Sequence, residues 1–225
     1  MTATARGPGR DSRPAIGTRP PSARVRNVVF DFGGVLVSWR PQEIIDSFYA
    51  EPHMREALRT HAFHHDDWLD MDRGTLDEAS VVRRCAARMA RPESELEALF
   101  AHVRAALTPI EPTVEFLREL RQRKGLKLYG LSNMSEAIFA YLDQRHDFFK
   151  LFDGIVVSAA VKLLKPEPAI YEHLRDRFDL DFAESVFIDD LARNVESARR
   201  AGLPAIQFVS TEQVRRELEP LLPAQ

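Results

Sequence analysis

Five short apolar runs, each followed at once by polar side chains, constrain this chain more than any other feature of its sequence. They occupy residues 28–30, 126–131, 155–157, 186–188 and 205–209. Their apolar character is largely continuous rather than alternating, which is typical of strands that are buried on both faces of a sheet. We therefore predict that these runs form a parallel sheet.

Segments with helical spacing of apolar residues lie between these runs, at residues 113–125, 135–146, 167–178 and 192–204. Gly125 and Gly202 stand where helices are expected to end, and Ser135 stands where one is expected to begin. Strand alternating with helix predicts an α/β doubly wound, Rossmann-like core. Ligands bind at the carboxyl ends of the strands in such sheets, so the polar residues that follow the runs should meet in one crevice.

Residues 40–110 break this alternation. Helical patterns occupy residues 41–50, 53–63, 75–90 and 93–107, and no strand pattern interrupts them. We predict that residues 25–39 and 111–225 form the core domain. Residues 40–110, called the cap segment below, are predicted to form a helical cap that is long enough to cover the crevice.

Composition and charge indicate a globular protein of the cytoplasm. Of the 225 residues, 44% are hydrophobic and 29% are charged, and the net charge of −3 gives no global attraction to nucleic acid or to an anionic membrane. No stretch is long and apolar enough to span a bilayer, and the single cysteine cannot form an internal disulfide. Residues 1–24 are rich in Arg, Pro and Gly and are predicted to be disordered. Nothing in the sequence indicates an oligomeric state.

The polar residues at the predicted strand ends are suited to phosphate and metal chemistry. Asp31 follows the first run, and Ser132 and Asn133 follow the second, just before a helix whose N-terminus favours phosphate. Asp189 and Asp190 follow the fourth run, and adjacent acids repel unless a cation or hydrogen bonds compensate. Clustered oxygen ligands suit Mg²⁺. Lys165 supplies a positive charge from the sequence KLLKPEP.

Four motifs in order resemble the haloacid dehalogenase-like hydrolase superfamily, in the branch with a helical cap inserted after the first motif. They are FDFGGVL at residues 30–36, GLSN at 130–133, KPEPAIY at 165–171 and FIDDLARNVESARRAG at 187–202. Any one of these motifs alone would be weak, but their joint occurrence in this order is specific. The resemblance covers the chain from about residue 28 to residue 208.

The resemblance implies a role for each matching residue in phosphoryl transfer. Asp31 would be the nucleophile that forms an aspartyl-phosphate, which water then hydrolyses. Ser132, with help from the backbone of Asn133, would hold the transferring phosphoryl group. Lys165 would neutralise charge on the phosphate and on the nucleophile.

The resemblance also implies a Mg²⁺ site. Asp190 would bind the ion together with Asp31 and the backbone carbonyl of Gly33. Asp189 would act from behind Asp190 or through water. Asn194, in the first turn of the last main helix, either orients the acid pair or satisfies loop carbonyls.

Gly33 is a departure from the pattern of this superfamily. Most of its phosphatases have Asp two residues after the nucleophile, where it protonates the leaving group and then activates water. Glycine keeps the carbonyl but cannot do this proton transfer, which is typically worth about 100- to 10,000-fold in rate. The expected consequence is slower turnover, a preference for good leaving groups, or a replacement from the cap or from water. Some sugar-phosphate phosphatases of this branch are similar in having Gly at this position.

The leading interpretation is a Mg²⁺-dependent phosphatase of small phosphorylated metabolites, for example sugar phosphates. One alternative is a metal-independent 2-haloacid dehalogenase, against which the acid pair Asp189–Asp190 argues, because dehalogenases of this superfamily lack the metal-binding acids. Another is a catalytically weakened member that acts as a binding module, for which Gly33 is the best support. A sugar phosphomutase is disfavoured because mutases of this family have the second Asp. Trp39, at the hinge into the cap, either lines a substrate pocket or packs the cap on the core.

Overall fold

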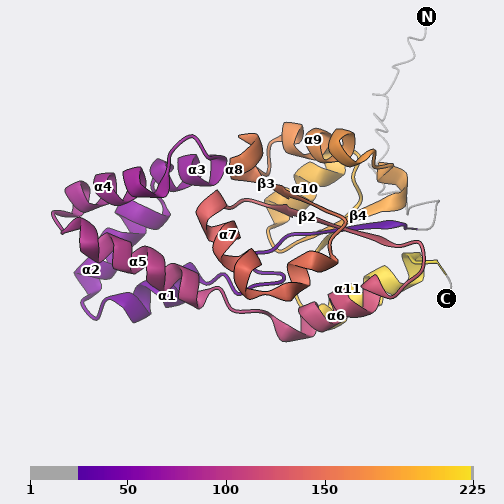
Figure 1. Ribbon diagram of the computed structural model, residues 1–225, viewed down its shortest axis with the longest axis horizontal. Helices are drawn as coiled ribbons and strands as arrows, with labels where there is room; N and C mark the ends of the chain where they lie inside the picture. Colours follow the sequence, from indigo (N-terminus) through magenta and orange to yellow (C-terminus); the bar gives the residue numbers. More distant parts are fainter. Residues whose placement is uncertain (1–24, 224–225) are drawn as a thin grey trace, which may run out of the picture.

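The computed structural model describes residues 25–223 and has a parallel five-stranded sheet at its centre (Figure 1). The strand order is β3-β2-β1-β4-β5, and every neighbouring pair is parallel. This confirms the predicted α/β doubly wound fold. The bounds of the strands are β1 Asn27–Phe30, β2 Lys127–Ser132, β3 Gly154–Val157, β4 Ser185–Asp189 and β5 Ala205–Gln207.

Helices cover both faces of the sheet, and alternate residues of the central strand pack against different layers. Val28 and Phe30 belong to the hydrophobic cluster that contains α6, α7 and α11, whereas Val29 belongs to the cluster that contains α9 and α10. Figure 1 shows α9 and α10 on one side of the sheet and α6 and α11 on the other. The bounds of these helices are α6 Glu111–Arg121, α7 Glu136–Arg145, α9 Pro168–Phe178, α10 Ala192–Arg200 and α11 Thr211–Leu218.

Four short elements complete the core: the 3₁₀ turns η2 Asp147–Leu151, η3 Phe182–Glu184 and η4 Glu219–Leu221, and the single helical turn α8 Ser158–Val161. The turn α8 begins directly after β3, so it stands at the same edge of the sheet as the carboxyl ends of the strands. At this edge α8 contacts the cap segment.

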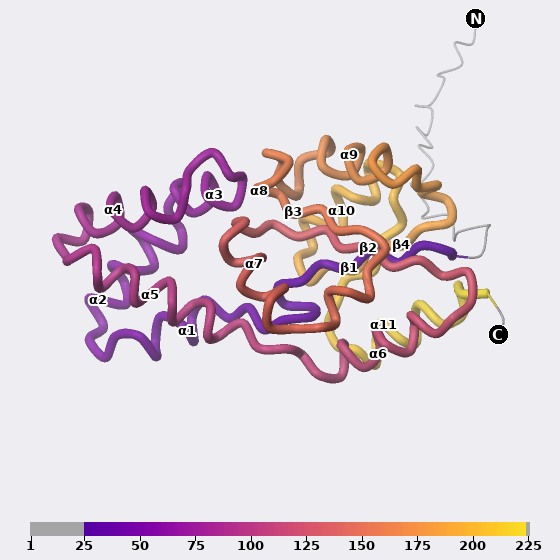
Figure 2. Tube along the Cα trace, viewed as in Figure 1, coloured from indigo at the N-terminus to yellow at the C-terminus, as the bar shows by residue number. Residues whose placement is uncertain are grey.

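The cap segment is helical, as predicted, and has a hydrophobic cluster of its own. Its elements are α1 Pro41–Phe48, α2 Pro52–Leu58, the π-helical turn η1 Arg59–Phe63, α3 Asp66–Arg73, α4 Glu78–Met89 and α5 Glu93–Ala106. The cluster contains Leu58, Trp68, Leu96 and Phe100, all buried. Figure 2 shows that the chain leaves the core after β1 and returns to it after α5. The helix α3 was not predicted from the sequence. The proposed boundaries at residues 39–40 and 110–111 stay a prediction.

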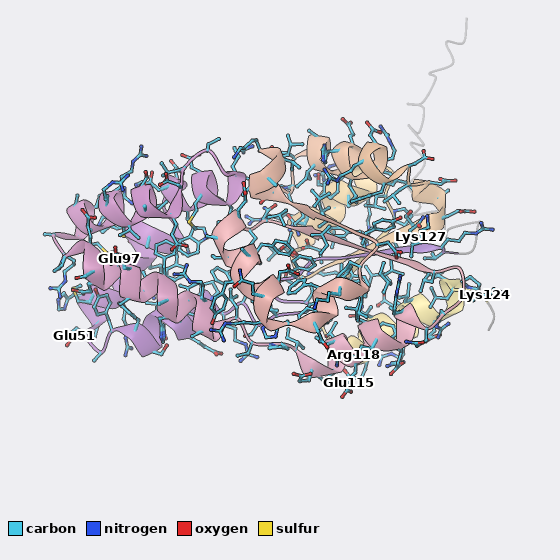
Figure 3. The ribbon with its side chains drawn as sticks, in the orientation of Figure 1. Glu51, Glu97, Glu115, Arg118, Lys124 and Lys127 are labelled. Carbon is cyan, nitrogen blue, oxygen red and sulfur yellow. The ribbon has the colours of Figure 1, made fainter. Side chains whose placement is uncertain are left out.

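The cap segment lies over the carboxyl ends of the strands (Figure 1). Figure 3 shows Lys124 and Lys127 at the opposite end of the core, where β2 begins, and Glu51 and Glu97 on the cap segment. The crevice predicted at the strand ends is therefore bounded by the core on one side and by the cap helices on the other.

No helix within residues 25–223 is both long and apolar enough to cross a membrane. The predicted disordered arm, residues 1–24, lies outside the described residues.

Candidate active site

The strand-end residues singled out in the sequence meet around one cavity of about 440 Å³. Asp31 follows β1, Ser132 ends β2, and Asp189 ends β4. The core contributes lining residues that the sequence analysis singled out: Asp31, Gly33, Trp39, Ser132, Asn133, Lys165, Asp190 and Asn194. Asp189 does not line the cavity itself. It contacts Lys165, which does line the cavity.

Lys165 is held in one place by its neighbours. Its ammonium lies 2.9 Å from Asp31 and 2.7 Å from Asp189, and it also donates to the carbonyl of Leu131 at 3.0 Å. The side-chain amide of Asn133 donates to the Lys165 carbonyl and accepts from the Lys165 amide, both at 2.8 Å. All three ammonium protons thus have acceptors, and the loop that carries Lys165 is fastened to the end of β2.

The carboxylate of Asp189 is fully buried and saturated with donors. It accepts from the amide of Leu191 at 2.8 Å, from Lys165 at 2.7 Å, and from the Asn194 amide at 3.0 Å to each oxygen. Asn194 therefore orients the first acid of the pair, which decides between its two predicted roles. These contacts hold the Asp189 carboxylate and the Lys165 ammonium against each other.

The negative charge of the site exceeds its positive charge. Burial raises the pKa of Asp31 to about 7, with Lys165 opposing the shift and Asp189 and Asp190 adding to it. Burial and the charge of Asp189 also raise the pKa of Asp190. Burial by itself would lower the pKa of Lys165, but the carboxylates of Asp31 and Asp189 beside it raise this pKa overall, so the lysine stays an ammonium. One ammonium faces three carboxylates, which calls for a further cation.

The donor set fits a hard divalent cation such as Mg²⁺. Asp31, Asp189 and Asp190 each offer a carboxylate oxygen, and these oxygens all lie within 4.8 Å of one another. Because hydrogen bonds occupy both oxygens of Asp189, the available ligands are Asp31, Asp190 and the carbonyl of Gly33. Within residues 25–223 that carbonyl accepts no hydrogen bond.

Two glycines shape this cation site differently. Gly34 has a φ of 73°, and a Cβ there would lie 2.4 Å from an oxygen of Asp190. Only glycine therefore lets the Asp190 carboxylate lie against this turn. A Cβ at Gly33 would meet only Trp39, at 3.5 Å, which is ordinary contact.

The outer wall of the cavity is apolar. Phe63 stacks on Trp68 with ring centroids 4.7 Å apart, and Trp39 lies 5.9 Å from Trp68. Leu69 from α3 and Leu191 from the core also line it, and they are 53% and 41% exposed. Trp39 both lines the cavity and packs against the hydrophobic clusters of the cap segment and the core, so its two predicted roles are both met.

Two titratable residues of the cap segment line the cavity and were not predicted as site residues: His64 and Asp72. Asp72 is half-buried, and burial raises the pKa of its carboxyl to about 7. The sequence around it, WLDMDRGTL, has no motif that separates Asp72 from the neighbouring Asp70. Only the docking of α3 on the core distinguishes the two acids.

A larger hollow of about 850 Å³ lies beside the hinge. It shares Trp39 and Asp190 with the first cavity, but Asp31, Ser132 and Lys165 do not line it. The chemistry described below belongs to the smaller cavity.

Comparison with known proteins agrees with the fold. The model of the haloacid dehalogenase-like hydrolase family matches residues 25–202, most of the chain. The chain belongs to this family. It is therefore a member of a family of hydrolytic enzymes, as its four motifs predict.

Named relatives and solved structures extend this result. The sesquiterpene phosphatase astK of Aspergillus oryzae is 28% identical over 194 residues, which are 86% of this chain and 95% of astK. The HAD family enzyme bt-2542 of Bacteroides thetaiotaomicron, solved in complex with magnesium and inorganic phosphate, has a TM-score of 0.67 at 20% identity and covers 81% of this chain and 93% of its own. The L-2-haloacid dehalogenase of Xanthobacter autotrophicus, with chloropropionic acid covalently bound, has a TM-score of 0.62 at 24% identity and covers 88% and 85%. The two solved structures are similar to this chain in fold.

Proposed function

We propose that this protein is a Mg²⁺-dependent phosphatase that hydrolyses phosphate monoesters through an aspartyl-phosphate on Asp31. The observation that carries this proposal is the buried arrangement of Asp31 beside the Lys165 ammonium, with the available oxygens of Asp190 and Gly33 on the same cavity. The phosphatase activity in the name of astK and the magnesium and phosphate bound to bt-2542 support it.

Asp31, Lys165 and Ser132 each have a task in this reaction. Asp31 attacks the phosphorus, and the bond between phosphorus and the ester oxygen breaks. Lys165 balances the charge of the phosphoryl oxygens. The hydroxyl of Ser132 makes no hydrogen bond to another residue within 25–223, so it can donate to one of those oxygens. A Mg²⁺ ion held by Asp31, Asp190 and the Gly33 carbonyl would offset the negative charge of the phosphate and the two acids.

We further propose that the organic group of the substrate is apolar. On the cap side, the cavity is lined by the apolar side chains of Phe63, Trp68 and Leu69. The polar side chains on that side are His64 and Asp72. A sugar would leave most of its hydroxyls without partners on such a wall, which costs free energy, whereas a hydrocarbon chain would gain by burial. This favours an apolar phosphate ester over the sugar phosphates considered from the sequence. The sesquiterpene named for astK is consistent with it.

Phosphate release from octyl phosphate, farnesyl phosphate and glucose 6-phosphate, with and without Mg²⁺, tests both parts of the proposal. We expect Mg²⁺-dependent release that is fastest with the two apolar esters and absent in Asp31→Asn. Asp143→Asn, an exposed acid on α7, is the matched control and should keep full activity. Equal activity of Asp31→Asn and the unmodified protein would refute the aspartyl-phosphate mechanism.

Two further measurements test the two alternatives. Halide release from 2-chloropropionate without added metal would identify a dehalogenase. Tight binding of phosphate esters without turnover would identify a binding module. The acid pair Asp189–Asp190 weighs against the dehalogenase, because a reaction that needs no metal gives no reason to hold a second carboxylate beside the first.

A further inference from the structure

The proposed reaction lacks a proton donor at the position where the sequence pattern expects one. When the ester bond breaks, the leaving oxygen of an aliphatic alcohol becomes an alkoxide unless a proton reaches it during the step. Gly33 has no side chain to supply that proton. The following inference rests on the proposed phosphatase function, and it names the residue that supplies the proton instead.

Few titratable groups line the cavity, and most already have other tasks. Asp31 is the nucleophile, Lys165 is committed to Asp31 and Asp189, and Asp190 belongs to the cation site. Arg193 has a guanidinium side chain, which donates hydrogen bonds but has no acceptor atom that could take a proton. His64 and Asp72 remain, and both come from the cap segment.

We infer that Asp72 is the general acid and general base of this enzyme. Asp72 is half-buried and lines the same cavity as Asp31 from the cap segment, whereas His64 is exposed. No donor within residues 25–223 pairs with the Asp72 carboxyl, so it is free to exchange protons with a ligand. An in-line leaving group departs on the side of the phosphorus opposite the attacking oxygen, and Asp72, on the cap side of the cavity, is the acid that we assign to that side.

The core fixes the position of Asp72. The backbone carbonyl of Asp72 accepts from the hydroxyl of Ser158, which in turn accepts from the amide of Met134 at 2.9 Å. Met134 follows the phosphate-site residues Ser132 and Asn133 in the chain. A short chain of hydrogen bonds thus ties the acid on the cap to the end of β2.

Two further contacts lock the end of α3 onto the core. Arg73 makes a bidentate ion pair with Glu167, two residues after Lys165, and Lys162 of the core donates to the carbonyl of Gly74. A Cβ at Gly74 would collide with the carbonyl of Ala159, so only glycine permits this approach. Such rigidity is what a proton donor needs, since a misplacement of about 1 Å costs roughly 100-fold in rate.

Burial poises Asp72 for both directions of proton transfer. It raises the pKa of the carboxyl to about 7, so the acid and its conjugate base are both populated near neutral pH. The other charged or titratable side chains that line the cavity are His64 of the cap segment and Asp31, Lys165, Asp190 and Arg193 of the core. Arg73, the next residue in the chain, pairs with Glu167 rather than with Asp72.

The two steps balance with Asp72 in this role. In the first, Asp31 bonds to phosphorus, the electron pair of the broken ester bond goes to the leaving oxygen, and the Asp72 carboxyl gives that oxygen its proton. In the second, the Asp72 carboxylate takes a proton from water, whose oxygen bonds to phosphorus as the bond to Asp31 breaks. The products are the alcohol and inorganic phosphate, and both acids return to their starting forms.

Leaving-group dependence tests this role. Asp72→Asn should lower kcat with octyl phosphate about 100- to 10,000-fold, because the alkoxide leaves without a proton. With p-nitrophenyl phosphate, whose leaving group needs no proton, the variant should release one equivalent of p-nitrophenolate in a burst. Slow turnover should follow because the base is missing from the second step. Mass spectrometry should then find phosphate on Asp31.

Controls separate this inference from the function on which it rests. Asp70→Asn, on the same helix but outside the cavity, should behave as the unmodified protein. Equal losses with both substrates and no burst, unchanged rates in Asp72→Asn, or the burst signature in His64→Gln instead would each overturn the role of Asp72. Mg²⁺-dependent release in the unmodified protein would still stand in those cases. A lack of release from both esters in the unmodified protein would refute the proposed function and the role of Asp72 with it.

Discussion

The ammonium of Lys165 lies 2.9 Å from the carboxylate of Asp31, and the two side chains are only 1% and 9% exposed. This pair joins the third sequence motif, KPEPAIY, to the first. It keeps the proposed nucleophile beside a positive charge in a place where burial disfavours its ionised form. Asp189 holds the lysine from behind, so the pair is one side of a buried network rather than an isolated bridge.

Removal of the lysine should damage both stability and activity. In Lys165→Met, Asp31 and Asp189 lose their shared partner, and breaking a buried ion pair costs about 3–5 kcal/mol. Urea unfolding should show this loss, and phosphate release should fall at least about 100-fold. Lys127→Met removes an exposed lysine at the far end of β2 and should change neither quantity (Figure 3). A stable, active Lys165→Met variant would contradict the network.

The two glycines after the nucleophile should respond differently to alanine. In Gly34→Ala the new Cβ meets the Asp190 carboxylate at 2.4 Å in a left-handed backbone conformation, which by itself costs about 1–2 kcal/mol. The Mg²⁺ concentration for half-maximal activity should rise at least about 10-fold, since about 1.4 kcal/mol corresponds to that factor. Gly33→Ala should bind Mg²⁺ normally because its Cβ has room. Identical Mg²⁺ activation curves for both variants would exclude Asp190 as a ligand.

The exposed leucines of the cavity should set the preference for apolar esters. Leu69→Ser should raise KM for octyl phosphate by about 10- to 100-fold, the equivalent of burying one leucine side chain. Its KM for a short ester such as methyl phosphate should stay the same, because that substrate does not reach α3. Val209→Ser is the matched control, since Val209 is 77% exposed but lies outside the cavity. Equal KM changes in both variants would indicate a nonspecific effect.

Asp72 should lower the stability of the fold at neutral pH. Its pKa rises from 3.8 in the unfolded chain to about 7 in the folded protein, so between these values the folded state binds more protons. Stability attributable to Asp72 is therefore highest below pH 4, falls as pH rises toward 7, and stays low above it. After a discount for partial exposure, Asp72→Asn should gain about 1–3 kcal/mol at pH 8 and nothing at pH 4. Urea unfolding at the two pH values measures this, and a gain that does not depend on pH would contradict the shift.

The sequence determined the framework of this protein because its signals are local. Each strand is a short apolar run, and the residue that follows it stands at the carboxyl edge of a parallel sheet whatever the order of the strands. Asp31, Ser132 and the pair Asp189–Asp190 could therefore be placed at one crevice from their neighbours in the chain alone. The family motifs and the alternating elements gave the same answer, and the structure confirms the fold.

The tertiary structure determined features of the site that the local sequence does not encode. The short helix α3 escaped prediction, and only its docking on α8 brings Asp72 to the cavity, through a hydrogen bond from Ser158 that spans 86 residues of sequence. Likewise, Asp189 and Asp190 are neighbours of the same type, and only the donors around Asp189 separate a positioning acid from an available ligand. Burial and hydrogen-bond partners depend on which distant segments meet: α3 meets α8 beside Asp72, and the loop that carries Lys165 meets the end of β4 at Asp189.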